Sequence, residues 1–295
     1  MIVRWVGFHI LIFILLAVDL LVFRKKEMKW KAVLLWSLIW ITLSLLFNGL
    51  IFWQDGVEKG IEFFTAYLIE KSLSVDNLFI FLLIFSYFKV PKALQHRLLF
   101  LGIFGALVLR LGLILAGISL IGSFHFVIYV LGAVVGVTGF RLIFQKQQQT
   151  LQQSRLLKFI RRHFKVTEEY VGSQFIVRQG KSSYWTPLML ALVMIESSDI
   201  LFALDSIPAV LAVTNDIFIA YTSNVFAVLG LRALFFLIAP WFELLTHLKI
   251  GLGAILLFIG LKMVIAPIWA IPLSISLAVI ATILLISVIY SFLRR

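Results

Sequence analysis

The sequence contains no cysteine among its 295 residues. This absence excludes disulfide bonds, thiolate metal sites and cysteine nucleophiles, so a bound metal ion would need oxygen or imidazole ligands. The five histidines show no paired ligand spacing, which argues against a histidine metal site. No phosphate-binding loop of the Walker type occurs either, so a nucleotide-driven activity is not expected. No His or Cys lies near the acidic residues within the apolar runs, so the chain does not resemble an enzyme.

Charged residues are also scarce, at 14%, whereas hydrophobic residues make up 62% of the chain. These values are far from those of soluble globular proteins and predict a polytopic membrane protein. The net charge of +12 comes from basic residues beside apolar runs, where they orient the protein and contact anionic lipids. We therefore expect membrane lipids as partners and no nucleic acid.

Apolar runs of membrane-spanning length predict an all-α protein with nine transmembrane helices. They lie at about 5–23, 31–53, 61–88, 98–121, 124–144, 187–213, 217–239, 250–267 and 271–292. The first run lacks a small-x-small cleavage site, so we interpret it as a retained span rather than a signal peptide. Basic residues concentrate in alternate connections, which predicts an N-terminus outside and a cytoplasmic C-terminus.

Two of the predicted spans contain a matching acidic pattern. In each segment an acid is followed, six residues later, by a second acid and a small polar residue. The polar residues of the two segments are Glu70, Asp76, Asn77, Glu196, Asp199, Asp205 and Ser206. A charge at the bilayer centre costs at least about 2.5–3.5 kcal/mol, so this group indicates a functional site.

Further landmarks recur in the same order. Phe104 to Arg110 matches Phe226 to Arg232, and the glycines around 132–139 match those around 253–260, which we expect to permit close helix contact. A unit of three helices is odd, so two such units must face opposite ways across the membrane, as in transporters with inverted repeats. The predicted organisation is two peripheral helices (1–60), a first repeat (61–144), a basic cytoplasmic loop with a small hairpin (145–186), a second repeat (187–265) and a last helix with the C-terminus (266–295).

Carboxylate, amide and hydroxyl oxygens are the ligands of hard divalent cations. We expect Asp76 and Asp205 to coordinate such an ion directly, while the other acids supply ligands or carry an exchanged proton. Pro208 predicts a helix break near 204–208, and the serines before Asp76 predict one near 72–76.

Three further polar residues lie within the predicted repeats. Arg110 and Arg232 occupy equivalent mid-span positions, where they either neutralise the acids or gate the site. Asn224 is either a ligand or a helix–helix contact. Asp19 and Asn48, outside the repeats, are expected at the membrane interface.

The acidic segments, with Thr222-Ser-Asn-Val-Phe-Ala227 and Gly230-Leu-Arg-Ala233, resemble the TerC family of integral membrane proteins, in particular its Alx branch. The resemblance covers roughly residues 60–265. It implies a manganese exporter of the bacterial inner membrane, and that Glu70, Asp76, Glu196, Asp199 and Asp205 are the acids of the family motifs.

The leading hypothesis is a secondary transporter that exports divalent metal ions, with Mn²⁺ as the first candidate and protons as the candidate exchanged ion. No cofactor is expected, because the metal would be the substrate. Two alternatives stay open: an exporter of organic solutes such as amino acids, with Arg110 or Arg232 binding a carboxylate, and a membrane assembly or metallation factor. The sequence does not fix the metal or the oligomeric state.

Overall fold

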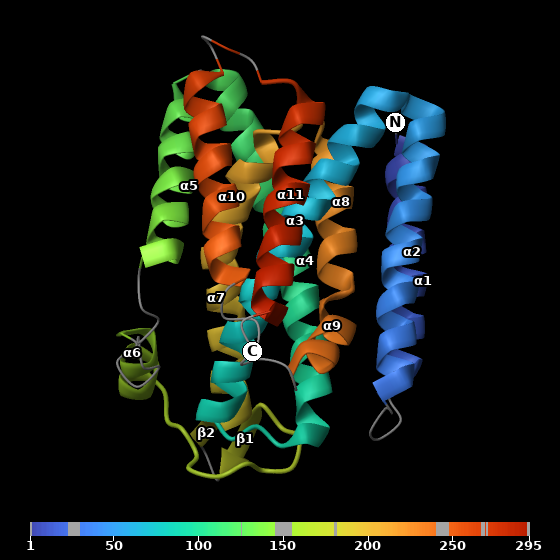
Figure 1. Ribbon diagram of the computed structural model, residues 1–295. Coiled ribbons are helices and arrows are strands. Elements are labelled where there is room, and N and C mark those ends of the chain that lie inside the picture. Colours follow the sequence, from blue (N-terminus) through green and yellow to red (C-terminus); the bar gives the residue numbers. More distant parts are fainter. Residues whose placement is uncertain are drawn as a thin grey trace.

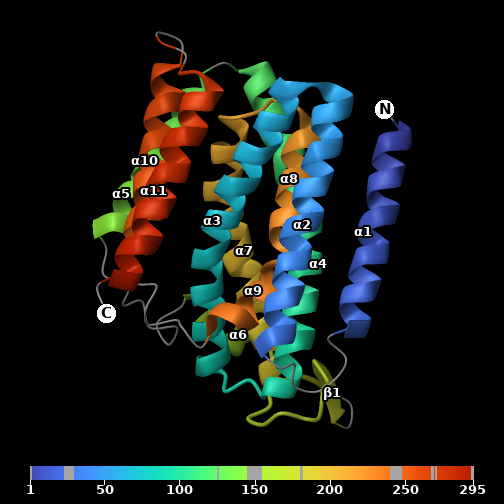
Figure 2. The same cartoon turned by 45° about the vertical axis from the view of Figure 1, so that its right-hand side comes forward.

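The computed structural model describes residues 2–22, 30–124, 126–144, 155–179, 182–239, 248–266, 269 and 271–293. Its elements form a bundle of long, roughly parallel helices with a short helix and a β-hairpin at one end (Figures 1 and 2). The elements are α1 (Ile2–Val22), α2 (Trp30–Asp55), α3 (Val57–Tyr87), α4 (Lys92–Ser123), α5 (Val127–Phe144), α6 (Arg155–His163), β1 (Ile176–Gln179), β2 (Ser182–Trp185), α7 (Pro187–Leu211), α8 (Ile217–Leu229), α9 (Leu231–Ile238), α10 (Leu248–Ile265) and α11 (Leu273–Leu293).

Seven helical stretches of the described chain are long and apolar enough to cross a membrane, with α8 and α9 together forming one of them. The bundle also exposes many large apolar side chains, including Leu46, Val137 and Ile286, on its outer helices. An apolar exterior of this kind fits a multi-pass integral membrane protein. Of the other predicted spans, α3 carries six charged residues along its length, and the apolar part of α10, Ile250–Ile265, is shorter.

The helices alternate in direction along the bundle. In both ribbon views α1 begins at the upper end and α11 ends at the lower end (Figures 1 and 2). In Figure 2, α1 lies at one edge of the bundle and α5, α10 and α11 lie at the other. Helices α3, α4 and α5 run down, up and down, whereas α7, α8–α9 and α10 run up, down and up. We call α3–α5 the first triplet and α7–α10 the second. Helix α3 packs against α8 and helix α4 packs against α7, so the first helix of each triplet contacts the second helix of the other.

Helices α5 and α10 meet backbone to backbone at two glycine pairs. A Cβ added to Gly139 would lie 2.6 Å from the carbonyl oxygen of Gly253, and one added to Gly260 would lie 2.6 Å from that of Gly132. The expectation that these glycines permit close helix contact is therefore confirmed.

This contact predicts a specific sensitivity to one methyl group. Gly139→Ala is expected to lower the free energy of unfolding by about 1–3 kcal/mol, because the new Cβ would meet backbone atoms that cannot rotate away. Thermal unfolding in detergent measures the change. Gly136→Ala is the matched control, since its Cβ would meet nothing within 4 Å, and equal stability of the two variants would contradict the prediction.

The predicted helix breaks in the acidic segments are wrong, since α3 and α7 are continuous through residues 72–76 and 204–208. Ser72 donates its hydroxyl to the Leu68 carbonyl of its own helix, which leaves the backbone helical. Pro208 lies one turn before the end of α7, so its missing N–H removes only one helical bond. The helical interruption in the second triplet instead lies at Gly230, between α8 and α9.

The predicted hairpin in the basic connection is confirmed. Strands β1 and β2 pair antiparallel, with Ile176 opposite Trp185. Next to them, the Tyr170 hydroxyl donates to the Phe88 carbonyl at 2.7 Å, which ties this connection to the turn between α3 and α4. Burial raises the pKa of Tyr170 to about 12, so the hydroxyl stays protonated and keeps donating at neutral pH.

Candidate functional site

The centre of the bundle contains one arginine bound to two carboxylates. Arg110 of α4 lies 2.7 Å from Glu70 of α3, between Nη1 and Oε2. It also binds Asp199 of α7 through two contacts, Nη2 to Oδ1 at 3.1 Å and Nε to Oδ2 at 3.3 Å. All three side chains are buried, with at most 3% of each residue exposed. Two carboxylates against one guanidinium leave this group with an excess of negative charge.

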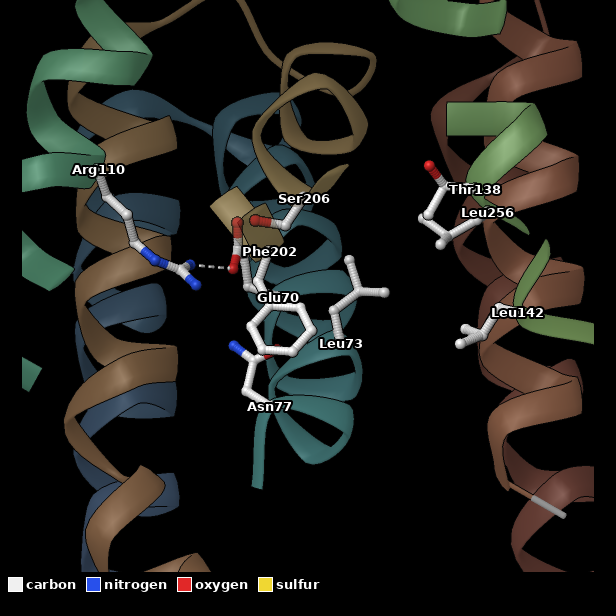
Figure 3. Close-up of a pocket in the computed structure, with 9 residues that line it drawn as sticks. All are labelled: Glu70, Leu73, Asn77, Arg110, Thr138, Leu142, Phe202, Ser206 and Leu256. Atoms are coloured by element: carbon white, nitrogen blue, oxygen red, sulfur yellow. Dashed lines mark hydrogen bonds and ion pairs between the residues drawn. The ribbon is translucent and has the colours of Figure 1, made fainter. Parts of the chain in front are cut away.

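A cavity of about 70 Å³ adjoins this group, at the junction of α3, α4, α5, α7 and α10. Its lining residues are Glu70, Leu73, Asn77, Arg110, Thr138, Leu142, Phe202, Ser206 and Leu256. Figure 3 shows Arg110 on one side, Thr138, Leu142 and Leu256 on the other, and the polar residues of α3 and α7 between them. This volume has room for a few water molecules or one partly hydrated ion.

Three polar atoms of the cavity wall have no hydrogen-bond partner among the described residues. They are Glu70 Oε1, Asn77 Nδ2 and Ser206 Oγ. Buried polar groups are normally paired, so unpaired ones that converge on one cavity indicate a place for a polar occupant. A half-turn of the Asn77 amide would present its oxygen in place of its nitrogen, giving a wall of carboxylate, amide and hydroxyl oxygens.

Helical spacing brings these groups together. Glu70, Leu73 and Asn77 follow one face of α3 at intervals of three and four residues, and Phe202 and Ser206 do the same on α7. The cavity therefore receives one polar segment from each triplet.

The other predicted site residues are distributed as follows. Glu196 lies against α4, where a Cβ on Gly105 would come within 2.2 Å of its carboxylate. Asn224 is buried in α8, and neither of its side-chain polar atoms has a partner among the described residues. The side chains of Asp76 and Asp205 lie outside the described part of the structure. Among the side chains that are described, no three His, Asp or Glu residues form a group that could hold a metal ion.

Arg232 does not join the carboxylates around Arg110 in this structure. Its Nη2 lies 2.6 Å from Oδ2 of Asp19, a residue of α1. Asp19 and Asn48, predicted to lie at the membrane interface, are both buried inside the bundle. Asp19 can be buried because it forms this ion pair with Arg232, which compensates the cost of burying either charge alone.

Lys71 is a charged residue whose place the sequence did not reveal. Its ammonium donates to the Ala227 carbonyl at 3.2 Å, in the last turn of α8. Carbonyls in a last helical turn have no helical N–H partner, and the end of the helix carries negative partial charge. A Cβ on Gly230 would lie only 2.6 Å from Lys71 Nζ. Its position directly after Glu70 was the signal that a second charge enters the same span.

Comparison with known proteins identifies the family. The model of the integral membrane protein TerC family matches residues 55–295. The chain belongs to the TerC family. Its relatives in the family include an uncharacterized membrane protein, STKORF319, of Myxococcus xanthus, which is 44% identical over 293 residues, or 98% of this chain and 92% of that protein.

Two other TerC relatives carry a more specific name. A putative membrane-bound redox modulator, Alx, of Salmonella typhi is 44% identical over 297 residues, and that of Escherichia coli (strain K12) is 43% identical over 297 residues. Each alignment covers 97% of this chain and 92% of the relative. No solved structure matches the chain.

Proposed function

We propose that this TerC protein is a secondary transporter, not an enzyme, that exports divalent metal ions from the cytoplasm, with Mn²⁺ as the first candidate substrate. The observation that carries the proposal is the cavity into which Glu70, Asn77 and Ser206 each present a buried polar atom that has no hydrogen-bond partner within the described part of the chain. An acid, an amide and a hydroxyl are the donor types that hard cations bind. Mn²⁺, Ca²⁺ and Mg²⁺ all accept such donors, so the choice of metal is a matter for measurement.

Asp76 and Asp205 complete the proposed site. Each directly precedes a cavity-lining residue, Asn77 or Ser206, and the sequence places each in the same helix as that neighbour. Carboxylates that share one site repel one another, and a carboxylate that binds a cation must be deprotonated. Metal binding would then release protons, which provides a physical basis for exchange.

An inverted repeat of α3–α5 and α7–α10 underlies the proposed mechanism. The opposite directions of the two triplets support it. So do their reciprocal contacts, since the pair Gly132 and Gly260 becomes the pair Gly253 and Gly139 when the matched positions are exchanged. In this proposal the chain crosses the membrane nine times, and one triplet moves against the other to open the site to each side in turn.

The charge distribution supports a location in the bacterial inner membrane, with the N-terminus outside. The lower end of the bundle in Figure 1 holds the turn between α3 and α4, followed by Lys92 and Arg97, and also holds α6 with its four arginines and lysines. This basic end would face the cytoplasm and contact anionic lipids there.

An organic solute fits the cavity less well. Pockets for organic ligands usually measure about 300–1,000 Å³, well above the 70 Å³ here. The Arg110 guanidinium, which such an exporter would use to bind a carboxylate, is already bound by Glu70 and Asp199. The redox modulator name of some relatives does not point to thiol chemistry in this chain, because it contains no cysteine.

Manganese flux in inside-out membrane vesicles tests the proposed function. We expect flux with the native chain and its loss in Asp205→Asn, and an imposed proton gradient should change the native rate if protons are exchanged. If neither protein moves manganese although both are inserted and folded, the metal assignment is wrong. Competition by amino acids against metal flux would then test the organic-solute exporter.

A further inference from the structure

The two matched arginines of the repeat have different surroundings. Arg110 binds Glu70 and Asp199 in the centre of the bundle. Arg232, in the equivalent position of the second triplet, binds Asp19, and its Nη2 also donates to the backbone carbonyl of that residue. Both arginines are 1% exposed. The carboxylate next to Arg232 thus comes from a helix that belongs to neither triplet.

Asp19 is itself held in a fixed orientation. Trp36 of α2 donates its indole N–H to Asp19 Oδ1 at 2.7 Å, which leaves Oδ2 directed at Arg232. The family model begins at residue 55, so α1 and nearly all of α2 lie outside it. The N-terminal pair of helices therefore contributes a buried charge to the family domain, in addition to covering its surface.

The ion pair is located next to the interruption of the second triplet. Arg232 follows Gly230 by two residues, and Gly230 separates α8 from α9. On the other side of the interruption, Lys71 of α3 donates to Ala227. Two residues thus contact the junction of α8 and α9. Lys71, next to the cavity-lining Glu70, binds the end of α8, and Asp19 of α1 binds the start of α9.

We propose that Asp19 is a positioning residue for transport: by binding Arg232 it holds α9 in its present orientation and keeps the counterpart of Arg110 away from the carboxylate site. This inference rests on the proposed function for its effect on transport. Without the Asp19 charge, Arg232 loses this ion pair and keeps the hydrogen bond to the Asp19 backbone carbonyl, so the attachment of α9 to α1 is weaker. The cavity residues are unchanged, so the maximal rate changes rather than the metal concentration that gives half-maximal flux.

The absence of native cysteine allows a direct readout of α9. Leu234, a partly buried residue of α9, can be replaced by cysteine as the only thiol in the chain. We expect Asp19→Asn to increase the maleimide labelling rate of Leu234→Cys by at least about fivefold and to lower maximal Mn²⁺ flux by a similar factor. The half-saturating Mn²⁺ concentration should change by less than about twofold.

Three further variants separate positioning from simple charge neutralisation. Asp19→Glu should restore both labelling and flux. The double variant Asp19→Asn with Arg232→Gln buries no unpaired charge, so it should fold, yet it should still show fast labelling and low flux because α9 is not held. Asp55→Asn is the matched control, since Asp55 also pairs with an α1 residue, Arg4, but at an exposed site, and neither readout should change.

The outcomes divide clearly. The inference is overturned if Asp19→Asn leaves labelling and flux unchanged, or if the double variant regains native values of both, since Asp19 would then only neutralise a charge. If the native chain moves no Mn²⁺ while labelling still depends on Asp19, the proposed transport of this metal fails and the positioning of α9 by Asp19 stands.

Discussion

Replacing Arg110 with Met should lower the free energy of unfolding by about 3–5 kcal/mol, because it leaves two buried carboxylates without their cation. Such a loss is a large fraction of the stability of most proteins, so the variant should accumulate poorly in the membrane. Denaturant unfolding in detergent and the amount of inserted protein measure the effect.

Two further variants test whether the loss of stability comes from the unpaired buried carboxylates. Arg97→Met is the matched control in the same helix, because Arg97 is exposed, where it donates to the Ser173 carbonyl and lies over the ring of Phe175. The triple variant Glu70→Gln, Arg110→Met and Asp199→Asn removes both signs of charge and should regain most of the lost stability. If Arg110→Met were as stable as the native protein, the three buried groups could not form the charge centre described here.

Asn77→Leu should reduce Mn²⁺ flux roughly tenfold or more. We expect the loss of one ligand to cost about 1.4 kcal/mol or more of binding free energy, and 1.4 kcal/mol corresponds to a tenfold change in affinity. Leucine is similar in size to asparagine but presents no polar atom to the cavity. Stability should be maintained or increased, because Asn77 Nδ2 has no partner among the described residues. Flux in inside-out vesicles and thermal unfolding of the same preparations measure the two effects.

Asn48→Leu is the matched control for this substitution. Asn48 is also buried and also has an atom, Oδ1, without a partner among the described residues, but it belongs to α2 and does not line the cavity. Its replacement should leave flux unchanged. Equal flux in Asn77→Leu and native vesicles would contradict the proposed role of the cavity.

Much of the fold could be predicted from the sequence, because each apolar run of about 20 residues has few alternatives to a membrane helix. The hairpin in the connection 145–186 and the close contacts at the glycines around 132–139 and 253–260 were also predicted, because each depends on a short stretch of sequence. The matched acidic segments also placed Glu70, Asn77 and Ser206 in one group, and these three residues line one cavity.

The interruptions and the charge pairs could not be predicted in the same way. Pro208 and the serines weaken a helix, but whether it breaks depends on the neighbouring helices that replace the lost bonds. Asp19 is near the end of its span and close to a run of basic residues, which is the usual position of an interfacial acid. Only the packing of α1 against the second triplet reveals that its partner is Arg232, more than two hundred residues away.

The glycine contact between α5 and α10 has a mechanical consequence. Side chains that interlock must change rotamer before one helix can slide along another, whereas bare backbone surfaces present no such barrier. The triplets meet through backbone atoms at Gly132, Gly139, Gly253 and Gly260, with few side chains such as Leu256 and Met263 beside them, while charged contacts hold the triplets together around Arg110. The α5–α10 contact is therefore the place where a small sliding movement between the two triplets would meet the least resistance, whereas the ion pairs around Arg110 oppose movement at the centre.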